Sequence, residues 1–336
     1  MTQPITSITR GPRQSNFELL RIIAMFMVLC QHADFLPFGT PNAQSIAVAP
    51  WSEFCRIFVE SAAIVGVNIF VMISGWFGIK ATLKGFCNFL FQVVYFYALT
   101  LLVTWLMDLN SLSPMNLARG FAIAQNGWFV TAYMILYVVS PILNNFLNTT
   151  SKQSQIKFLI GFFTLQTVYG FIGASHDFNL GYSAISFVGL YILAGFIRRN
   201  GIHTSLKYGG IIAWLSISLA QAIIFFIEPR SIARIFGYSN PLLIVSALAL
   251  VLQFNQFKIG TSKTINFIAA SAFGVYLMHN NVFTIQQVWV PMMQYLNTAC
   301  GWMAVAGAIV ATFFVAVVLD QPRKFMWNYI ATKFTR

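Results

Sequence analysis

Long apolar runs recur along the whole chain, separated by short polar or charged segments. Each run has about 17 to 25 residues, the length that a helix needs to cross a hydrocarbon core of about 30 Å. The pattern predicts an all-α, polytopic membrane helical bundle with about ten transmembrane helices. The predicted spans are Phe17–Phe35, Ile57–Ile79, Phe86–Met107, Trp128–Leu147, Ile156–Ile172, Leu180–Ile197, Tyr208–Ile227, Ile235–Phe254, Ile265–Ile285 and Gly301–Leu319.

The cations between these runs are unevenly distributed. With the N-terminus inside, ten spans place 16 of the 20 Lys and Arg in inner segments and only 4 in outer segments, namely Arg56, Arg119, Arg230 and Arg234. Cytoplasmic segments of membrane proteins carry such an excess. We therefore expect both termini in the cytoplasm, with a disordered basic tail over residues 1–16, a transmembrane domain over 17–320 and a basic tail over 321–336.

Composition supports the membrane setting. The chain is 58% hydrophobic and only 8% charged, whereas an average soluble domain is about 25% charged. The net charge of +12 follows from inner cations that face anionic lipid, without a basic stripe interleaved with aromatics. We expect membrane lipid and no nucleic acid as a partner, and the sequence does not specify the oligomeric state.

Several familiar catalytic motifs are missing from the sequence. It contains no Walker A loop, no G-x-G-x-x-G and no G-x-S-x-G. The four cysteines form no C-x-x-C pair, and the four histidines are scattered. We therefore expect no metal site and no permanently bound cofactor.

The first apolar run carries the most informative polar residues. It contains Glu18 and Arg21 near its start and His32 near its end. On a helix, eleven residues advance about 20° past three full turns, so Arg21 and His32 share a face and lie about 16 Å apart. Ionisable side chains inside a membrane cost roughly 2.5 kcal/mol or more, and they normally face a protein interior or a water-filled cavity.

This arrangement suits transfer from a phosphate-bearing donor. An imidazole can take a proton from a hydroxyl nucleophile near neutral pH, and a guanidinium presents a donor fork to phosphate. The structural alternative is that Arg21 only anchors the inner end of the helix, paired with Glu18 three residues earlier. In that case His32 lies in the outer headgroup region.

Four segments together resemble the acyltransferase-3 family of integral membrane O-acyltransferases. Glu18-x-x-Arg21, ten residues and then His32 resemble the signature of the family's first helix. NIFVMISGWF at 68–77 resembles its FF-x-x-SG segment, and NGWFVTAYMILYVVSPIL at 126–143 resembles its W-F helix with Y-x-x-x-P. SAFGVYLMHNNVF at 271–283, which contains Tyr276 and His279, resembles its S-x-G-I/V-Y-L-x-H segment.

The resemblance implies an O-acetyltransferase of a bacterial inner membrane, with acetyl-CoA or another acyl-CoA as co-substrate. The acceptor would be a hydroxyl of a cell-surface polysaccharide or a lipid-linked sugar. The position that matches His32 would be catalytic, as a general base or as a transient acyl carrier, and the general base needs only one transfer. The position that matches Arg21 would be essential and would bind the donor.

Two lysines and a Ser-Gly pair extend the candidate site. Many members of the family carry R-x-x-R after the SG segment, which is taken to bind CoA phosphates. This chain has Lys80 and Lys84 there, which would serve phosphate as point charges or would be ordinary inner-face lysines. Ser74 and Gly75 are small enough for the close approach of a helix or a ligand.

Three more residues are candidates for a shared cavity. His279 lies about as deep in its predicted span as His32, so the two histidines face one cavity or His279 binds a neighbouring helix. Glu60 pairs with Arg56 one turn earlier or lines a polar cavity near His32. Trp128 is an interfacial belt residue or a platform for stacking a sugar. The leading alternative function is a transporter or flippase of a lipid-linked glycan, which does not need acyl-CoA.

Overall fold

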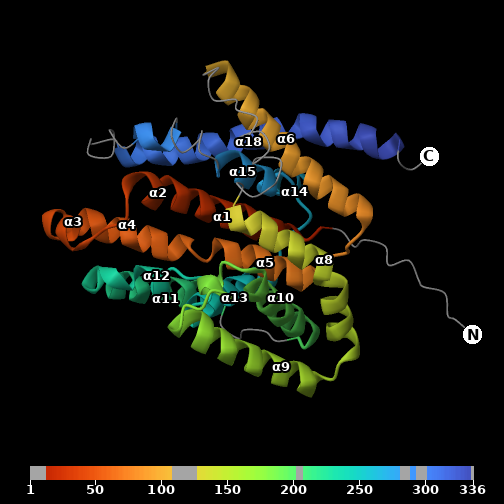
Figure 1. The fold of residues 1–336 in the computed structure, drawn as a ribbon, viewed down its shortest axis with the longest axis horizontal. Helices are drawn as coiled ribbons and strands as arrows, with labels where there is room; N and C mark the ends of the chain where they lie inside the picture. Colours follow the sequence, from red (N-terminus) through yellow and green to blue (C-terminus); the bar gives the residue numbers. More distant parts are fainter. Residues whose placement is uncertain (1–12, 108–126, 202–206, 281–287, 293–300, 334–336) are drawn as a thin grey trace, which may run out of the picture.

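The computed structural model describes residues 13–107, 127–201, 207–280, 288–292 and 301–333, and in these ranges the regular elements with assigned bounds are all helices (Figure 1). Along the first half of the chain they are α1 (Ser15–Ala33), α2 (Phe35–Phe38), α3 (Ala43–Val48), α4 (Pro50–Ala63), α5 (Gly66–Phe77), α6 (Leu83–Met107) and α8 (Gly127–Thr149). The remaining elements are α9 (Lys152–Leu165), η2 (Gln166–Ile172), η3 (Asn179–Gly181), α10 (Ala184–Arg199), α11 (Gly209–Ile227), η4 (Pro229–Ser231), α12 (Ile232–Ile235), α13 (Pro241–Gln256), α14 (Lys263–Ala269), α15 (Ala272–His279) and α18 (Gly301–Lys333).

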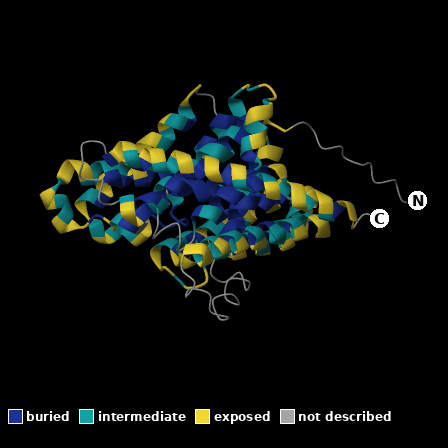
Figure 2. Cartoon of the chain, turned by 90° about the horizontal axis from the view of Figure 1, so that it is seen from above, coloured by how far each residue is buried: buried dark blue, intermediate teal, exposed yellow. Residues whose placement is uncertain are grey.

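Helix α1 lies in the middle of the molecule. It packs against α4, α5 and α13 on one side and against α14, α15 and α18 on the other (Figure 1). The buried residues gather around this centre, and the exposed residues lie on the outer faces of the surrounding helices (Figure 2). The first predicted span is therefore the helix around which the others pack.

The outer helices present apolar side chains to their surroundings. Leu106 on α6, Ile160 on α9, Ile227 on α11 and Val318 on α18 are all largely exposed. A soluble monomer rarely exposes such extensive apolar surface. The surface agrees with helices that face lipid tails, and the chain is a multi-pass membrane protein.

Seven helical segments in the described ranges are long and apolar enough to cross a membrane. They correspond to seven of the ten predicted spans. The other three predicted spans coincide with shorter helices, and the number ten stays a prediction. Helix α10 begins only after the non-helical turn of η3, α13 begins at Pro241 behind the capping Asn240, and the span that begins at Ile265 is divided into α14 and α15.

Two predicted spans are interrupted beside α1. The span Ile57–Ile79 consists of α4 and α5, and the break between α14 and α15 lies at residues 270–271. At the first break, Gly66 lets α5 approach α1 closely, because a Cβ atom there would lie 2.8 Å from the Ala24 carbonyl oxygen. Both breaks therefore lie next to the central helix.

The two predicted tails differ from the structure at their inner ends. Helix α1 begins at Ser15. Ser15 and Asn16 are buried, and their side chains donate to the Asn266 side-chain oxygen and the Phe254 carbonyl oxygen. Helix α18 continues past residue 320 to Lys333. Residues 1–12 and 334–336 lie outside the described ranges.

Candidate active site

Two histidines from distant parts of the sequence are in contact. His32 lies in the last turn of α1, and His279 ends α15. Nδ1 of His32 is 2.9 Å from Nε2 of His279, which is a hydrogen-bond distance. His279 is fully buried, whereas His32 is partly exposed and lines a cavity. Of the two alternatives for His279, the structure agrees with a bond to a neighbouring helix. His279 bonds His32 on α1, and it is not among the residues that line the three cavities described below.

The backbone of α15 fixes the tautomers of both rings. Nδ1 of His279 is 2.6 Å from the Val275 carbonyl oxygen, and a carbonyl oxygen can only accept, so this nitrogen carries a proton. In a neutral, fully buried His279 the Nε2 atom is then an acceptor, and Nδ1 of His32 donates to it. Among the described residues Nε2 of His32 then keeps an unbonded lone pair, which is the state that a general base needs.

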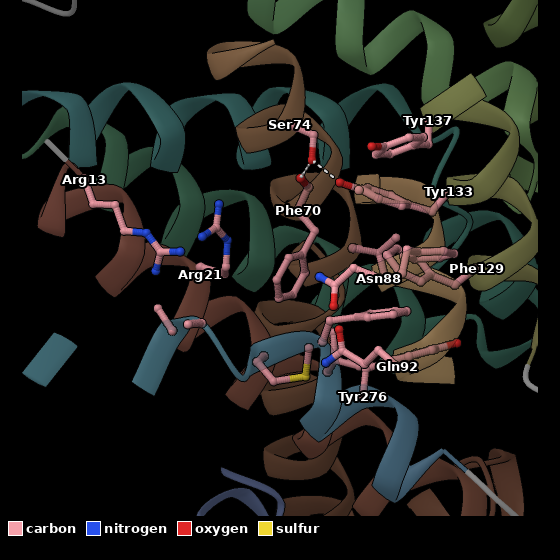
Figure 3. Close-up of a pocket in the computed structure, with 18 residues that line it drawn as sticks. Arg13, Arg21, Phe70, Ser74, Asn88, Gln92, Phe129, Tyr133, Tyr137 and Tyr276 are labelled. Atoms are coloured by element: carbon pink, nitrogen blue, oxygen red, sulfur yellow. Dashed lines mark hydrogen bonds between the residues drawn. The ribbon is translucent and has the colours of Figure 1, made fainter. Parts of the chain in front are cut away.

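A cavity of about 350 Å³, here called the arginine cavity, lies beside the first half of α1. Arg13 and Arg21 line it together with side chains of α5, α6, α8, α14 and α15. In Figure 3 the two arginines lie at one side of the cavity and Phe129, Tyr133 and Tyr276 lie at the other. One end of the cavity is therefore cationic and the opposite end is aromatic.

Polar contacts hold the walls of the arginine cavity. Arg21 is paired with Glu18 one turn earlier, as the structural alternative predicted, and it also lines the cavity. The Ser74 hydroxyl is 3.0 Å from both the Phe70 carbonyl oxygen and the Tyr133 hydroxyl (Figure 3). Ser74 thus connects α5 to α8 at the cavity wall.

A second cavity of about 530 Å³, here called the histidine cavity, lies at the other end of α1. His32 lines it, and Val28, Val67, Phe129 and Tyr276 line both this cavity and the arginine cavity. The two cavities therefore adjoin at these four side chains. The Tyr276 ring is 6.5 Å from the His32 ring between centroids, and its hydroxyl accepts a bond of 2.8 Å from the Asn280 amide.

A third cavity of about 620 Å³, here called the basic cavity, adjoins the arginine cavity through Arg13, Asn88 and Ala270. Its cations come from the N-terminal segment, α14 and α18, and its walls include the rings of two aromatic residues. These residues are Arg13, Lys263, Arg323, Lys324, Phe267 and Trp327. Arg323 and Lys324 are paired with Asp320, at 2.8 Å and 3.1 Å.

Lys80 and Lys84 are exposed near the start of α6 and are not among the residues that line these three cavities. Their proposed contact with the donor stays a prediction. Gly75 has a packing role, because a Cβ atom there would lie 2.2 Å from the Tyr191 carbonyl oxygen on α10.

Glu60 does not pair with Arg56, so that structural alternative is wrong. In the described ranges Arg56 forms its ion pairs with Asp34 at 2.7 Å and Glu53 at 2.9 Å. Glu60 instead lines the histidine cavity with His32 and Trp128. Trp128 packs against other rings of that cavity rather than standing alone at the molecular surface.

Sequence reasoning missed several residues of these cavities. Gln31 lines the histidine cavity beside His32, and Tyr133 lines the arginine cavity. Arg13 and Lys324 were interpreted only as inner-face cations. The only sequence signal for Arg13 and Lys324 was the number of cations in the two terminal segments. The sequence pattern does not show which of these cations lie at the same cavity.

A family model described as an acyltransferase domain matches residues 14–321, which is most of the chain. Comparisons with curated proteins and with solved structures found no significant match. The matched range contains α1 with His32, α15 with His279, and α18 as far as Gln321.

Proposed function

The chain belongs to the acyltransferase-3 family and is a multi-pass membrane acyltransferase, and from this premise we propose its reaction. It moves an acetyl or other short acyl group from cytoplasmic acyl-CoA to a hydroxyl of a cell-surface polysaccharide or a lipid-linked sugar. The observation that carries the proposal is the bonded chain from the Val275 carbonyl oxygen through His279 to His32. His32 lines a cavity, and this position supports its role as the base.

In the proposed reaction His32 is the general base. Its Nε2 takes the proton of the acceptor hydroxyl while the hydroxyl oxygen forms a bond to the thioester carbonyl carbon. The carbon–sulfur bond then breaks, and the CoA thiolate takes the proton from the His32 imidazolium. The products are an acyl ester and CoA with a free thiol, and His32 returns to its starting state.

The arrangement of the cavities supports an acyl-CoA donor. The basic cavity offers cations for phosphates and rings for a base to stack on. The adjoining arginine cavity carries Arg21 and ends at the aromatic side chains that it shares with the histidine cavity. A long donor that enters at the basic cavity would thus direct its thioester toward His32.

The test is transfer from radiolabelled acetyl-CoA into the surface-glycan fraction of membranes that carry the wild-type protein or His32→Ala. We expect label with the wild type and a loss of at least about 10²-fold without the base. His176→Ala is the matched control, because His176 is exposed and distant in sequence from both histidines of the site.

The outcomes separate the proposal from its alternative. Retained transfer by His32→Ala would remove His32 from the mechanism. An absence of label even with the wild type, in membranes that contain both the protein and the acceptor, would favour another acyl donor or a transporter of a lipid-linked glycan.

A further inference from the structure

Two buried polar atoms at the histidine cavity have no hydrogen-bond partner among the described residues. They are Oε2 of Glu60 and Nε2 of Gln31. Both side chains line the cavity beside His32. Glu60 is 6% exposed and Gln31 is 5% exposed. One atom can accept a hydrogen bond and the other can donate one.

Unpaired polar atoms at such depth need a physical reason. Leaving a buried donor or acceptor unsatisfied is costly, and a carboxyl group costs more than an amide. The nearest cation on the same helix, Arg56, is already bonded to Asp34, Glu53 and the Gly39 carbonyl oxygen. A ligand in the cavity would satisfy Glu60 and Gln31 together.

The rest of the cavity wall is aromatic. The rings of Trp128, Tyr182 and Tyr238 form one cluster, with centroids 4.6 Å to 5.3 Å apart. The Tyr238 hydroxyl also lies 3.5 Å from Oε1 of Gln31. A wall of aromatic rings with a few placed polar groups is typical of a small-molecule site.

A strained turn holds one part of this wall. Asn179 and Leu180 have φ of +44° and +52°, a region that non-glycine residues rarely occupy. The Leu180 carbonyl oxygen accepts a bond of 3.0 Å from the Ser239 amide, and Leu180 lines the cavity. Backbone strain of this kind gathers at ligand sites.

The charge of the cavity selects among ligands. The described residues that line it include Glu60 and no Lys or Arg, in contrast to the arginine and basic cavities. A phosphate or a carboxylate would meet a carboxyl group there without a cation to neutralise it. Hydroxyl groups, in contrast, can both donate to Glu60 and accept from Gln31.

We infer that the histidine cavity is the subsite for a neutral sugar ring, with Glu60 accepting a hydrogen bond from one hydroxyl and Gln31 donating one to another. The aromatic cluster covers the ring, and a further hydroxyl lies within reach of His32. This inference rests on the proposed function, because it assigns the acceptor of that reaction.

The test is direct binding, which does not depend on acyl transfer. Surface glycans from the cells that produce the protein are labelled with tritium and separated by ion exchange into a neutral and an acidic pool. Binding of each pool to the purified full-length protein is then measured. Wild type should bind the neutral pool. Glu60→Leu and Gln31→Leu should bind it about tenfold or more weakly, and Glu60→Gln, which keeps an acceptor oxygen, should be intermediate. Acetyl-CoA binding should change less than about twofold.

Two matched controls keep the result specific. Gln166→Leu makes the same change at another buried glutamine, which does not line the cavity and whose amide atoms have no hydrogen-bond partner within the described ranges. Glu53→Gln changes another acid of α4 outside the cavity. Both variants should bind the neutral pool as the wild type does.

Each outcome decides the inference. Unchanged binding in the Glu60 and Gln31 variants, equal loss of glycan and acetyl-CoA binding, or binding of the acidic pool alone would overturn it. Absence of glycan binding by the wild type would also overturn it. Specific binding by a wild type that transfers neither an acetyl nor another short acyl group would support the sugar subsite and reject the proposed function.

Discussion

At the residue scale, His279 holds His32 rather than the substrate. One of its nitrogens is bonded to the Val275 carbonyl oxygen and the other to His32. With its ring fully buried, His279 has no nitrogen left for an acceptor hydroxyl. It is a positioning residue, because the hydrogen bond on one nitrogen of a histidine decides which of the two carries the proton.

We therefore predict that His279→Phe lowers kcat for acetyl transfer by about tenfold to a hundredfold, with KM for acetyl-CoA nearly unchanged. The expected loss in kcat is a part of the roughly 10²- to 10⁴-fold rate increase that a positioned base contributes. His279→Gln should recover part of the loss, since its amide oxygen can accept from His32. Steady-state kinetics in proteoliposomes measure both constants, and an equal effect on KM would indicate a structural role instead.

The same base sets the sign of the pH dependence. A general base acts only when it is unprotonated, so transfer should rise with pH as His32 loses its proton and then level off. The measurement is kcat against pH for wild-type protein and for His279→Gln. A rate that falls as pH increases across that range would contradict general-base catalysis by His32.

At the scale of elements, the crossing of α5 and α10 depends on one glycine. A Cβ atom on Gly75 would overlap the Tyr191 backbone. Overpacking of this kind costs about 1 to 3 kcal/mol, so Gly75→Ala should lower the free energy of unfolding by that amount. Gly161→Ala on α9 is the control, because nothing lies within 4 Å of its added Cβ, and alanine favours a helix. Thermal unfolding in detergent distinguishes the two, and equal stability would contradict the close crossing.

Under the proposed function, we predict that the donor binds at the basic cavity, whose cations include residues of α14 and α18, rather than at the start of α6. Lys324→Gln and Lys263→Gln should weaken binding of acetyl-CoA, because each removes a cation from the cavity. Lys80→Gln and Lys84→Gln, which change exposed lysines outside it, should bind nearly as the wild type does. Equilibrium binding of labelled acetyl-CoA in detergent compares the four variants, and the opposite pattern would return the site to α6.

The sequence predicted the helices better than their contacts. An apolar run long enough to cross a bilayer must form its hydrogen bonds internally, so helix follows from length and composition alone. The breaks beside α1 depend instead on neighbouring helices, as at Gly66 against Ala24. For Glu60 the sequence left open a pair with Arg56 one turn away or a place at a polar cavity. Arg56 is held by Asp34 from another segment, and Glu60 lines the cavity. Which acid pairs with Arg56 is thus decided by tertiary structure and not by spacing along the helix.

At the scale of the whole molecule, the cavities follow one another along α1. The basic cavity adjoins the arginine cavity, which adjoins the histidine cavity. The N-terminal end of α1 and the C-terminal end of α18 lie on the same side of the molecule, and α3 lies at the opposite side (Figure 1). Under the proposed function, the donor would enter from the side of the chain ends and the sugar from the side of α3.

This direction requires both ends of the chain in the cytoplasm, which the excess of inner cations predicts. In a cysteine-free background, single cysteines at the exposed positions Trp51, Arg230, Lys152 and Lys333 report the side of each segment to an impermeant maleimide. In sealed right-side-out vesicles Trp51→Cys and Arg230→Cys should react, whereas Lys152→Cys and Lys333→Cys should react only after permeabilisation. Reaction of Lys333→Cys in sealed vesicles would place the C-terminus outside, which requires an odd number of spans when the N-terminus is inside. The basic cavity, built partly from α18, would in that case face away from cytoplasmic acyl-CoA.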